Sequence, residues 1–411
     1  MTGPHPPTLL EDVLWKIISF VDRDRNTLCA CALVNKDWYP VFRRQLYRFV
    51  QARGDGVDKF VDSVARDPGL GGMVRELTLD SHFNDPVCAY KFFDIIIPHL
   101  TNLTSLTYAG LSIPYRNLPS FSSGWKSLTF LRLEAIKAHS FEDFIQLVSF
   151  HKGLQELEIY ACSWRQPNVH HHSIAPCSGS NLQELRLYEF QEYQLFDILR
   201  WLAKGNRRVR YLEIEGLGVS GEGVVNGPGH NTDSTFPRIW RDTLEAVSLE
   251  FPGELEELDT STKEYVISTL IAIIKFCHNL NTVRLRIGYD TLHMLGQVAT
   301  ILTGLTHLRR IALVFDFPAD ASDVLLGNNE ITWTDLDQNL ADLTRFGSLQ
   351  YVEVQCGWKR KEEQDEEDGD EGNGMDEDDE GWGEDEEMGE EHEWGMRRWM
   401  RMTRRPKERW T

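Results

Sequence analysis

A short phrase of apolar residues recurs along most of this 411-residue chain. The phrase is L-x-x-L-x-L, with other apolar residues at some positions, and its last two apolar residues alternate with polar ones. Alternation at every second residue predicts a short strand with one buried face. The ten copies are Val74-Leu77-Leu79, Leu103-Leu106-Tyr108, Leu128-Leu131-Leu133, Leu154-Leu157-Ile159, Leu182-Leu185-Leu187, Val209-Leu212-Ile214, Leu244-Val247-Leu249, Leu280-Val283-Leu285, Leu308-Ile311-Leu313 and Leu349-Val352-Val354.

The segments between the copies space their apolar residues differently. In 141–150, Phe141, Phe144 and Ile145 share one side of a helix. Helical patterns also cover 90–100, 195–202, 265–276, 292–302 and 336–343. The first five intervals between copies are 29, 25, 26, 28 and 27 residues, and later ones reach 41. A strand and a helix repeated in this way predict stacked units, because one unit cannot bury its apolar face alone.

These units resemble leucine-rich repeats of an irregular kind. The fourth copy places Cys162 where that family often has Asn or Cys, whereas the other copies have mixed residues there. The resemblance implies an α/β fold over 51–360, a solenoid of about ten repeats with a curved parallel sheet and helices on the convex side. Ordinary α/β alternation without repeats is the alternative.

The first 50 residues follow a different pattern, which predicts three short helices. Thr8 and Glu11 form a capping box at the start of the first helix. Its apolar stripe is Val13, Leu14, Ile17, Ile18 and Val21, the second helix covers Leu28–Val34, and the third carries Trp38, Phe42, Leu46 and Phe49 on one face. So short a domain cannot bury all of this apolar surface, which predicts either a docking surface or packing on the next domain.

These helices resemble an F-box of the variant found in fungal proteins. The matching residues are Leu9, Asp12, Val13, Leu14 and Ile17, then Leu28, Cys29–Ala32, Leu33, Val34 and Trp38. Leu10 stands where the family usually has proline. The resemblance implies that 1–50 binds the Skp-type adaptor of a cullin–RING ubiquitin ligase (an SCF complex). The residues implied in that contact are Leu9, Val13, Leu14, Ile17, Leu28, Leu33, Val34 and Trp38.

The predicted strands also indicate a second interaction surface. Residues between and after the buried aliphatics would lie on the concave face of the solenoid. In copies four to six these are Glu156, Glu158, Tyr160, Glu184, Arg186, Tyr188, Tyr211, Glu213 and Glu215. Carboxylates interleaved with tyrosines are a plausible surface for a basic, partly aromatic segment of a target protein. The alternative is a charged face that is simply solvated.

Charge divides the chain further. The net charge is −21, of which 361–394 contributes −19, whereas 395–411 contributes +6. Like-charged carboxylates with little apolar surface predict that the tail, 361–411, is disordered. A solubilising tail is the default interpretation, and binding to a basic partner or to the basic end is the alternative.

Several patterns argue against catalysis, cofactors and membranes. Gly216–Gly221 matches G-x-G-x-x-G, but loop residues follow it instead of the helix that a dinucleotide site needs. His170, His171 and His172 lie near Cys162 and Cys177 without the paired spacing of a zinc site. No nucleophile motif or membrane-spanning stretch is present, and the net negative charge disfavours nucleic acid. Scattered cysteines without a signal peptide predict a cytoplasmic or nuclear protein with free thiols.

The sequence therefore predicts a non-catalytic adaptor without a cofactor or metal. Its N-terminal helices would dock on the ligase, its solenoid would hold an unidentified target, and partner subunits would transfer ubiquitin. The alternative is a repeat scaffold for protein interactions, outside any ligase, whose N-terminal helices cap the solenoid. An enzyme built on the glycine-rich insertion is a third, weaker hypothesis.

Overall fold

The structure of the chain is a computed structural model. It describes residues 8–21, 24–80, 96–110, 112–113, 127–149, 151–164, 181–190, 192–204, 209–216, 240–251, 271, 273–275, 277–288, 302, 305, 307–318, 348–359 and 400–404.

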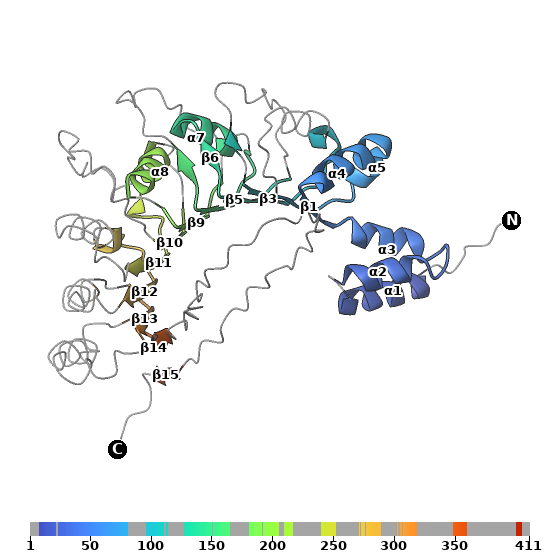
Figure 1. The fold of residues 1–411 in the computed structure, drawn as a ribbon. Helices are drawn as coiled ribbons and strands as arrows, with labels where there is room; N and C mark the ends of the chain where they lie inside the picture. The colour runs from blue at the N-terminus through green and yellow to red at the C-terminus, as the bar shows by residue number, and fades with distance from the viewer. Residues whose placement is uncertain are drawn as a thin grey trace, which may run out of the picture.

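The dominant feature is a sheet of parallel strands that succeed one another in chain order (Figure 1). The strands are β1 (Phe49–Arg53), β2 (Glu76–Asp80), β3 (Ser105–Ala109), β5 (Phe130–Glu134), β7 (Glu156–Tyr160), β9 (Glu184–Tyr188), β10 (Tyr211–Glu215), β11 (Ala246–Phe251), β12 (Thr282–Gly288), β13 (Arg310–Pro318) and β14 (Tyr351–Lys359). The sheet curves into an arc from β1 to β14, with α4 (Asp55–Arg66), α7 (Phe141–Ser149) and α8 (Glu192–Lys204) on its outer side. Parallel neighbours need a crossover connection, so the chain winds as an α/β coil.

The register places equivalent positions of the repeated phrase side by side. Leu157 of β7 pairs with Leu185 of β9, which pairs in turn with Leu212 of β10. The aliphatic residues form one continuous core along the arc, and most of them are fully buried. All ten strands predicted from the phrase are confirmed, because alternation of apolar residues leaves only one face of each strand able to form that core.

The helices on the outer side were predicted only in part. α7 (Phe141–Ser149) and α8 (Glu192–Lys204) lie where helical spacing indicated, and the short η1 (Ile97–His99) falls within 90–100. α4 (Asp55–Arg66) and α5 (Pro68–Gly71) were not predicted. The predicted helix 336–343 and most of the predicted helices 265–276 and 292–302 lie outside the described residues. Nowhere in the described part is a helix long and apolar enough to span a membrane.

A residue with a positive φ angle, in the left-handed region, directly follows each of five consecutive strands of the arc. These residues are Gly110, Ala135, Ala161, Glu189 and Gly216, with φ angles of 67°, 50°, 48°, 55° and 63°. The first four donate their backbone N–H to the last residue of the next strand, as when the Glu189 N–H binds the Glu215 carbonyl at 3.0 Å. The repeating turn directs the chain out of the large sheet. After three of these turns come β4 (Ser112–Ile113), β6 (Lys137–Ala138) and β8 (Ser163–Trp164), which pair in a small parallel sheet.

This turn yields a prediction about stability. A Cβ added at Gly216 would lie 3.3 Å from the backbone nitrogen of Glu189, in a left-handed conformation. We expect Gly216→Ala to lower the free energy of unfolding by about 1 kcal/mol, because L residues are strained there. Gly56→Ala is the matched control: Gly56 lies in α4, a Cβ there meets nothing within 4 Å, and the change should stabilise by about 0.5–1 kcal/mol. Thermal denaturation gives the change in melting temperature of each variant. Changes of the same sign in both variants would contradict this reasoning.

Three helices form a separate unit beyond the β1 end of the arc (Figure 1). They are α1 (Thr8–Val21), α2 (Arg25–Ala32) and α3 (Tyr39–Leu46), and Pro40 lies in the first turn of α3, where it is tolerated. Asp24 caps α2 by accepting the backbone N–H groups of Asn26 and Thr27. The unit has its own small core, distinct from that of the sheet, made of Leu14, Ile18, Leu28, Ala32 and Phe42.

The predicted boundary of this unit was wrong in one respect. The third helix was expected to include Phe49, but α3 ends at Leu46 and Phe49 begins β1. The carbonyl of Arg48 accepts N–H groups from Arg75 and Glu76, both at 3.0 Å, so backbone pairing with β2 begins there. The helical unit therefore ends before Phe49, and the sheet begins within the segment 1–50.

The tail has one described segment, β15 (Met400–Arg404), which pairs antiparallel with β14. For these five residues the expected disorder is wrong, and the other residues of 361–411 lie outside the described part of the chain. The edge of β14 offers backbone N–H and C=O groups that a further strand can satisfy.

Candidate functional site

The helical unit divides the residues predicted to contact a Skp-type adaptor into two groups. Leu14 and Leu28 belong to its core, with Ile17 and Trp38 half-buried against them. Val13, Leu33 and Val34 are exposed, Leu33 to 83%. The side chain of Leu9 lies outside the described residues. The exposed group is the part that can touch a partner without unfolding the unit.

Sequence reasoning missed three further apolar side chains on this surface. Trp15, Phe20 and Tyr39 are exposed, and Phe20 is 89% accessible. Phe20 comes seven residues after Val13, so both lie on the same side of α1. The available signal was that Trp15 and Phe20 fall off the buried stripe of the first helix, where water-facing aromatic residues are uncommon. We call Val13, Trp15, Phe20, Leu33, Val34 and Tyr39 the apolar surface of the helical unit.

An ion pair joins the helical unit to the start of the sheet. The Arg43 guanidinium of α3 donates to the carboxylate of Asp67, which precedes α5, at 2.5 Å. This hydrogen bond raises the pKa of Arg43. The same guanidinium lies over the rings of Tyr39 and Tyr47, at 5.8 and 6.0 Å from their centroids. One side chain thus bridges the two cores through polar contacts.

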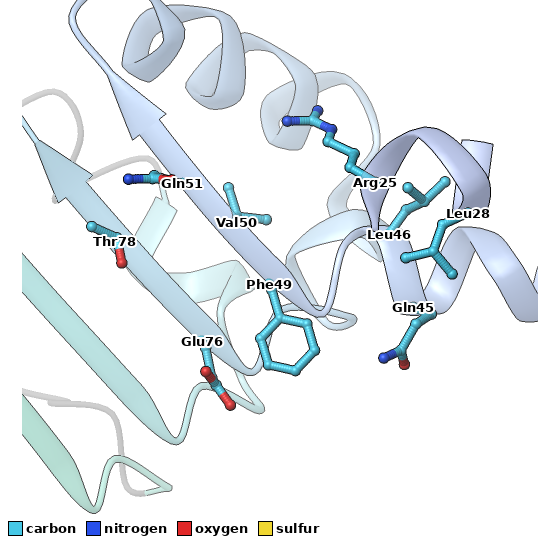
Figure 2. Close-up of a pocket in the computed structure, with 9 residues that line it drawn as sticks. All are labelled: Arg25, Leu28, Gln45, Leu46, Phe49, Val50, Gln51, Glu76 and Thr78. Atoms are coloured by element: carbon cyan, nitrogen blue, oxygen red, sulfur yellow. The ribbon is translucent and has the colours of Figure 1, made fainter. Parts of the chain in front are cut away.

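A hollow of about 410 Å³ lies where the helical unit meets β1 and β2 (Figure 2). Its lining residues are Arg25, Leu28, Gln45, Leu46, Phe49, Val50, Gln51, Glu76 and Thr78. Figure 2 shows Glu76 and Thr78 on β2, next to Phe49 and Gln51 of β1, with which they pair in register. The polar lining residues are Arg25, Gln45, Gln51, Glu76 and Thr78, and the apolar ones are Leu28, Leu46, Phe49 and Val50.

The concave face brings together all nine residues predicted to bind a target. Parallel pairing of β7, β9 and β10 arranges them in three rows. The rows are Glu156, Glu184 and Tyr211, then Glu158, Arg186 and Glu213, then Tyr160, Tyr188 and Glu215. Their neighbours along each strand, such as Leu157 and Leu185, point into the core. We call this set the Tyr–Glu surface.

Arg186 lies at the centre of the Tyr–Glu surface. Its guanidinium forms ion pairs with Glu158, with Glu184 at 3.0 Å and with Glu213 at 3.3 Å. It also lies 5.7 Å from the centroid of the Tyr211 ring. Three of the predicted carboxylates are therefore held by a cation of the same surface, and Glu213 is 9% exposed.

The two remaining glutamates, Glu156 and Glu215, have no cation within ion-pair distance among the described residues. Burial raises the pKa of Glu215, and the carboxylates of Glu213 and Glu250 raise it further, whereas the Arg286 guanidinium lowers it. Burial and then Glu184 raise the pKa of Glu156, which Arg186 lowers. At both positions the protein environment disfavours the negative charge, which an added cation would relieve.

The acidic character extends to β11, which sequence reasoning did not include. Glu250 comes after Leu249 as Glu215 comes after Ile214, so the repeated phrase itself marked this position. The Glu250 carboxylate accepts the Gly216 N–H at 3.1 Å and pairs with Arg286 at 3.3 Å. Arg286 also pairs with Asp316 at 2.6 Å, so one guanidinium forms ion pairs with two carboxylates.

Other chemically suggestive residues form no site in the described part of the chain. Cys162 is buried, and burial raises the pKa of its thiol to about 12, which suits a packing role. His170, His171, His172 and Cys177 lie outside the described residues, and no group of metal-ligating side chains occurs within them. Gly216 is the left-handed end of β10, and 217–221 are not described.

No protein-family model matches this chain, and no curated protein matches it. The resemblances to F-box and leucine-rich-repeat proteins therefore depend on the chain's own residues, above all the N-terminal apolar pattern and the ten copies of the phrase.

Proposed function

We propose that the protein is the substrate-recognition adaptor of an SCF ubiquitin ligase. The observation that carries the proposal is the separate helical unit, which keeps its own core and still exposes Phe20, Leu33 and Val34. An apolar surface of this kind on a small unit suits a protein partner. The F-box resemblance of the same residues points to a Skp-type adaptor, with the cullin–RING subunits joined through it.

The division into two units suits this role physically. The helical unit would be held by the ligase while the concave face of the sheet holds a target. Tethering raises the effective concentration of a target lysine near the ubiquitin-charged enzyme. The chain itself would then need no catalytic residue. Cytoplasm and nucleus are the compartments in which we expect it to act.

The second candidate is a repeat scaffold whose helical unit caps the sheet. The Arg43–Asp67 ion pair favours it, together with Tyr47 and Val50, which pack on the core of the sheet. A cap, however, stabilises a fold by covering apolar surface. Phe20 and Leu33 remain exposed to water, which a cap alone does not explain.

Binding of the full-length chain to a purified fungal Skp-type adaptor tests the proposal. We expect a stable complex, and we expect Phe20→Glu and Leu33→Glu to weaken it at least about tenfold, because a charge would be buried at an apolar contact. Ile17 is a poorer position for such a change, since it packs on the core of the helical unit. Calorimetric titration gives the dissociation constants.

Asn26→Glu is the control, because it adds the same charge at an exposed position in the first turn of α2, where an acidic residue suits the helix dipole. It should bind like the wild type. If the wild-type chain formed no complex at micromolar concentration, the adaptor proposal would be wrong. Equal weakening by all three variants would remove the evidence for an apolar contact.

A further inference from the structure

The large sheet already binds guanidinium groups of its own chain in a recurring way. Tyr211 donates its hydroxyl to Glu213 at 3.0 Å, and this pair holds Arg186 from the neighbouring strand. On the last strands Tyr351 donates to Glu353 at 3.2 Å. Arg310 of β13 lies 3.3 Å from that carboxylate and 5.0 Å from the Tyr351 centroid. In both places a carboxylate and a tyrosine ring share one arginine.

The same two groups stand side by side at Tyr188 and Glu215, which pair in register between β9 and β10. Here the described residues supply no cation within ion-pair distance of Glu215. The charge of Arg286 lowers the pKa of Glu215, but this guanidinium is ion-paired with Glu250 and Asp316. Arg186 is ion-paired with Glu158, Glu184 and Glu213. The position therefore has the carboxylate and the aromatic ring of the two arginine sites but no ion-paired arginine among the described residues.

The surroundings favour a cation from outside. On the concave face of β5 to β11 the charged residues are Glu134, Glu156, Glu158, Glu184, Glu213, Glu215 and Glu250 against Arg132 and Arg186, and Arg284 and Arg286 follow on β12. Tyr160 adds a second ring, 6.2 Å from that of Tyr188, and its hydroxyl is directed to Glu189 at 2.5 Å. A face with this excess of negative charge attracts basic segments and repels phosphate backbones.

We propose that the concave face of β7 to β11 binds an extended basic segment of a partner protein, with one arginine side chain seated between Glu215 and the Tyr188 ring. Arginine fits better than lysine because its planar guanidinium pairs with a carboxylate through two hydrogen bonds and stacks on an aromatic ring. The inference rests on the proposed function at one point only, because it takes this partner to be the target protein of the ligase. Glu158, Glu184 and Glu213, which sequence reasoning placed in the contact, also hold Arg186.

The test is fluorescence anisotropy of a labelled peptide of about eight alternating arginines and serines, long enough to cross the strands of β7 to β11 at their spacing of about 4.8 Å. The full-length wild-type chain should bind it, more weakly as salt is added. Glu215→Gln should weaken binding about tenfold and Tyr188→Leu several-fold. The corresponding lysine peptide should bind several-fold more weakly than the arginine peptide.

Two matched controls are needed because the acidic segment 361–394 can also attract a basic peptide. Glu380→Gln removes one charge from that segment, and Glu142→Gln removes one from the first turn of α7, on the outer side of the sheet. Both should leave the dissociation constant within about twofold. Glu215→Gln should also be no less thermostable than the wild type, because the folded protein raises the pKa of this carboxyl and so disfavours its charge at neutral pH. If the Glu215 carboxylate had a merely structural role, Glu215→Gln would be less thermostable than the wild type.

Absence of wild-type binding, or equal weakening by Glu380→Gln and Glu215→Gln, would overturn the proposal. Binding that emerged only after Arg404, Arg405 and Lys407 were replaced by serine would assign the face to the chain's own basic end and would also overturn it. The assay contains no ligase subunit, so its failure leaves adaptor docking untouched. Conversely, Leu33→Glu should bind the peptide normally.

Discussion

Replacing Trp164 by alanine is expected to lower the free energy of unfolding by about 3–5 kcal/mol, the usual loss for a large buried aromatic side chain. Trp164 is 3% exposed and its ring lies 5.0 Å from those of both Phe141 and Phe144. Phe190, after the next large strand, lies at 6.3 Å. The indole N–H donates to Asp197 of α8 at 3.2 Å. One side chain therefore joins α7, the turn after β9 and α8.

The repeat architecture makes this loss of stability extend beyond a single unit. Each unit of such a solenoid is stabilised chiefly by its neighbours, so a cavity between units weakens two interfaces together. We expect the main transition in urea to move to lower concentration and to broaden, as cooperativity along the arc is lost. Circular dichroism during urea titration measures both changes.

Two variants separate the contributions of Trp164. Trp164→Phe keeps an aromatic ring and removes the indole donor, which should cost about 1–3 kcal/mol because the Asp197 carboxylate is buried. Trp15→Ala makes the alanine change at a tryptophan that is 36% exposed on α1, and we expect the sheet to keep its stability. If Trp15→Ala and Trp164→Ala moved the main transition equally, the packing argument would fail.

The second large effect is expected at Phe42. This side chain is fully buried in the core of the helical unit and stacks on Trp38, with ring centroids 5.5 Å apart. Phe42→Ala should remove about 3–5 kcal/mol. A unit of about 40 residues has a total stability of only about 2–6 kcal/mol at the usual value per residue. We therefore expect α1 to α3 to unfold while the sheet remains folded.

Amide hydrogen exchange measured by mass spectrometry resolves the two units. In Phe42→Ala, peptides from 8–46 should lose protection and those from β2 to β10 should keep it. Tyr39→Ala removes a 47% exposed aromatic residue from the same helix and should preserve protection in both units. Loss of protection in the sheet together with the helices would favour the cap over the adaptor, because the two cores would then behave as one.

The parallel sheet was accessible from sequence because its signal is periodic. In β7 and β9 every second residue is aliphatic, and a shift by one residue would turn glutamates into the core. The concave position of Glu156, Tyr188 and their neighbours came from the same alternation. α4 was missed, although Val57, Phe60, Val61 and Val64 are buried on one face, because it precedes the first copy of the phrase.

The sequence predicted which residues lie together on the concave face, but it could not predict which of them contact one another. Alternation places Glu158, Arg186 and Glu213 on one face, but only the pairing of separate strands brings them to one guanidinium. For the same reason the sequence could not show that Glu215 has no cation within ion-pair distance among the described residues. On the helical unit, helical spacing gave one apolar stripe from Val13 to Val21, and only the fold shows that Leu14 and Ile18 are buried while Val13 is exposed.

The sequence by itself determined the parallel strands, their buried and exposed faces and the existence of an N-terminal helical segment. These depend on spacing along the chain, which local geometry converts directly into a face of a strand or helix. The tertiary structure decided where the helical unit ends and β1 begins, which apolar side chains of α1 and α2 remain exposed, and which carboxylates of the concave face are neutralised. Those outcomes depend on distances between segments far apart in sequence, and such distances exist only after the strands have paired.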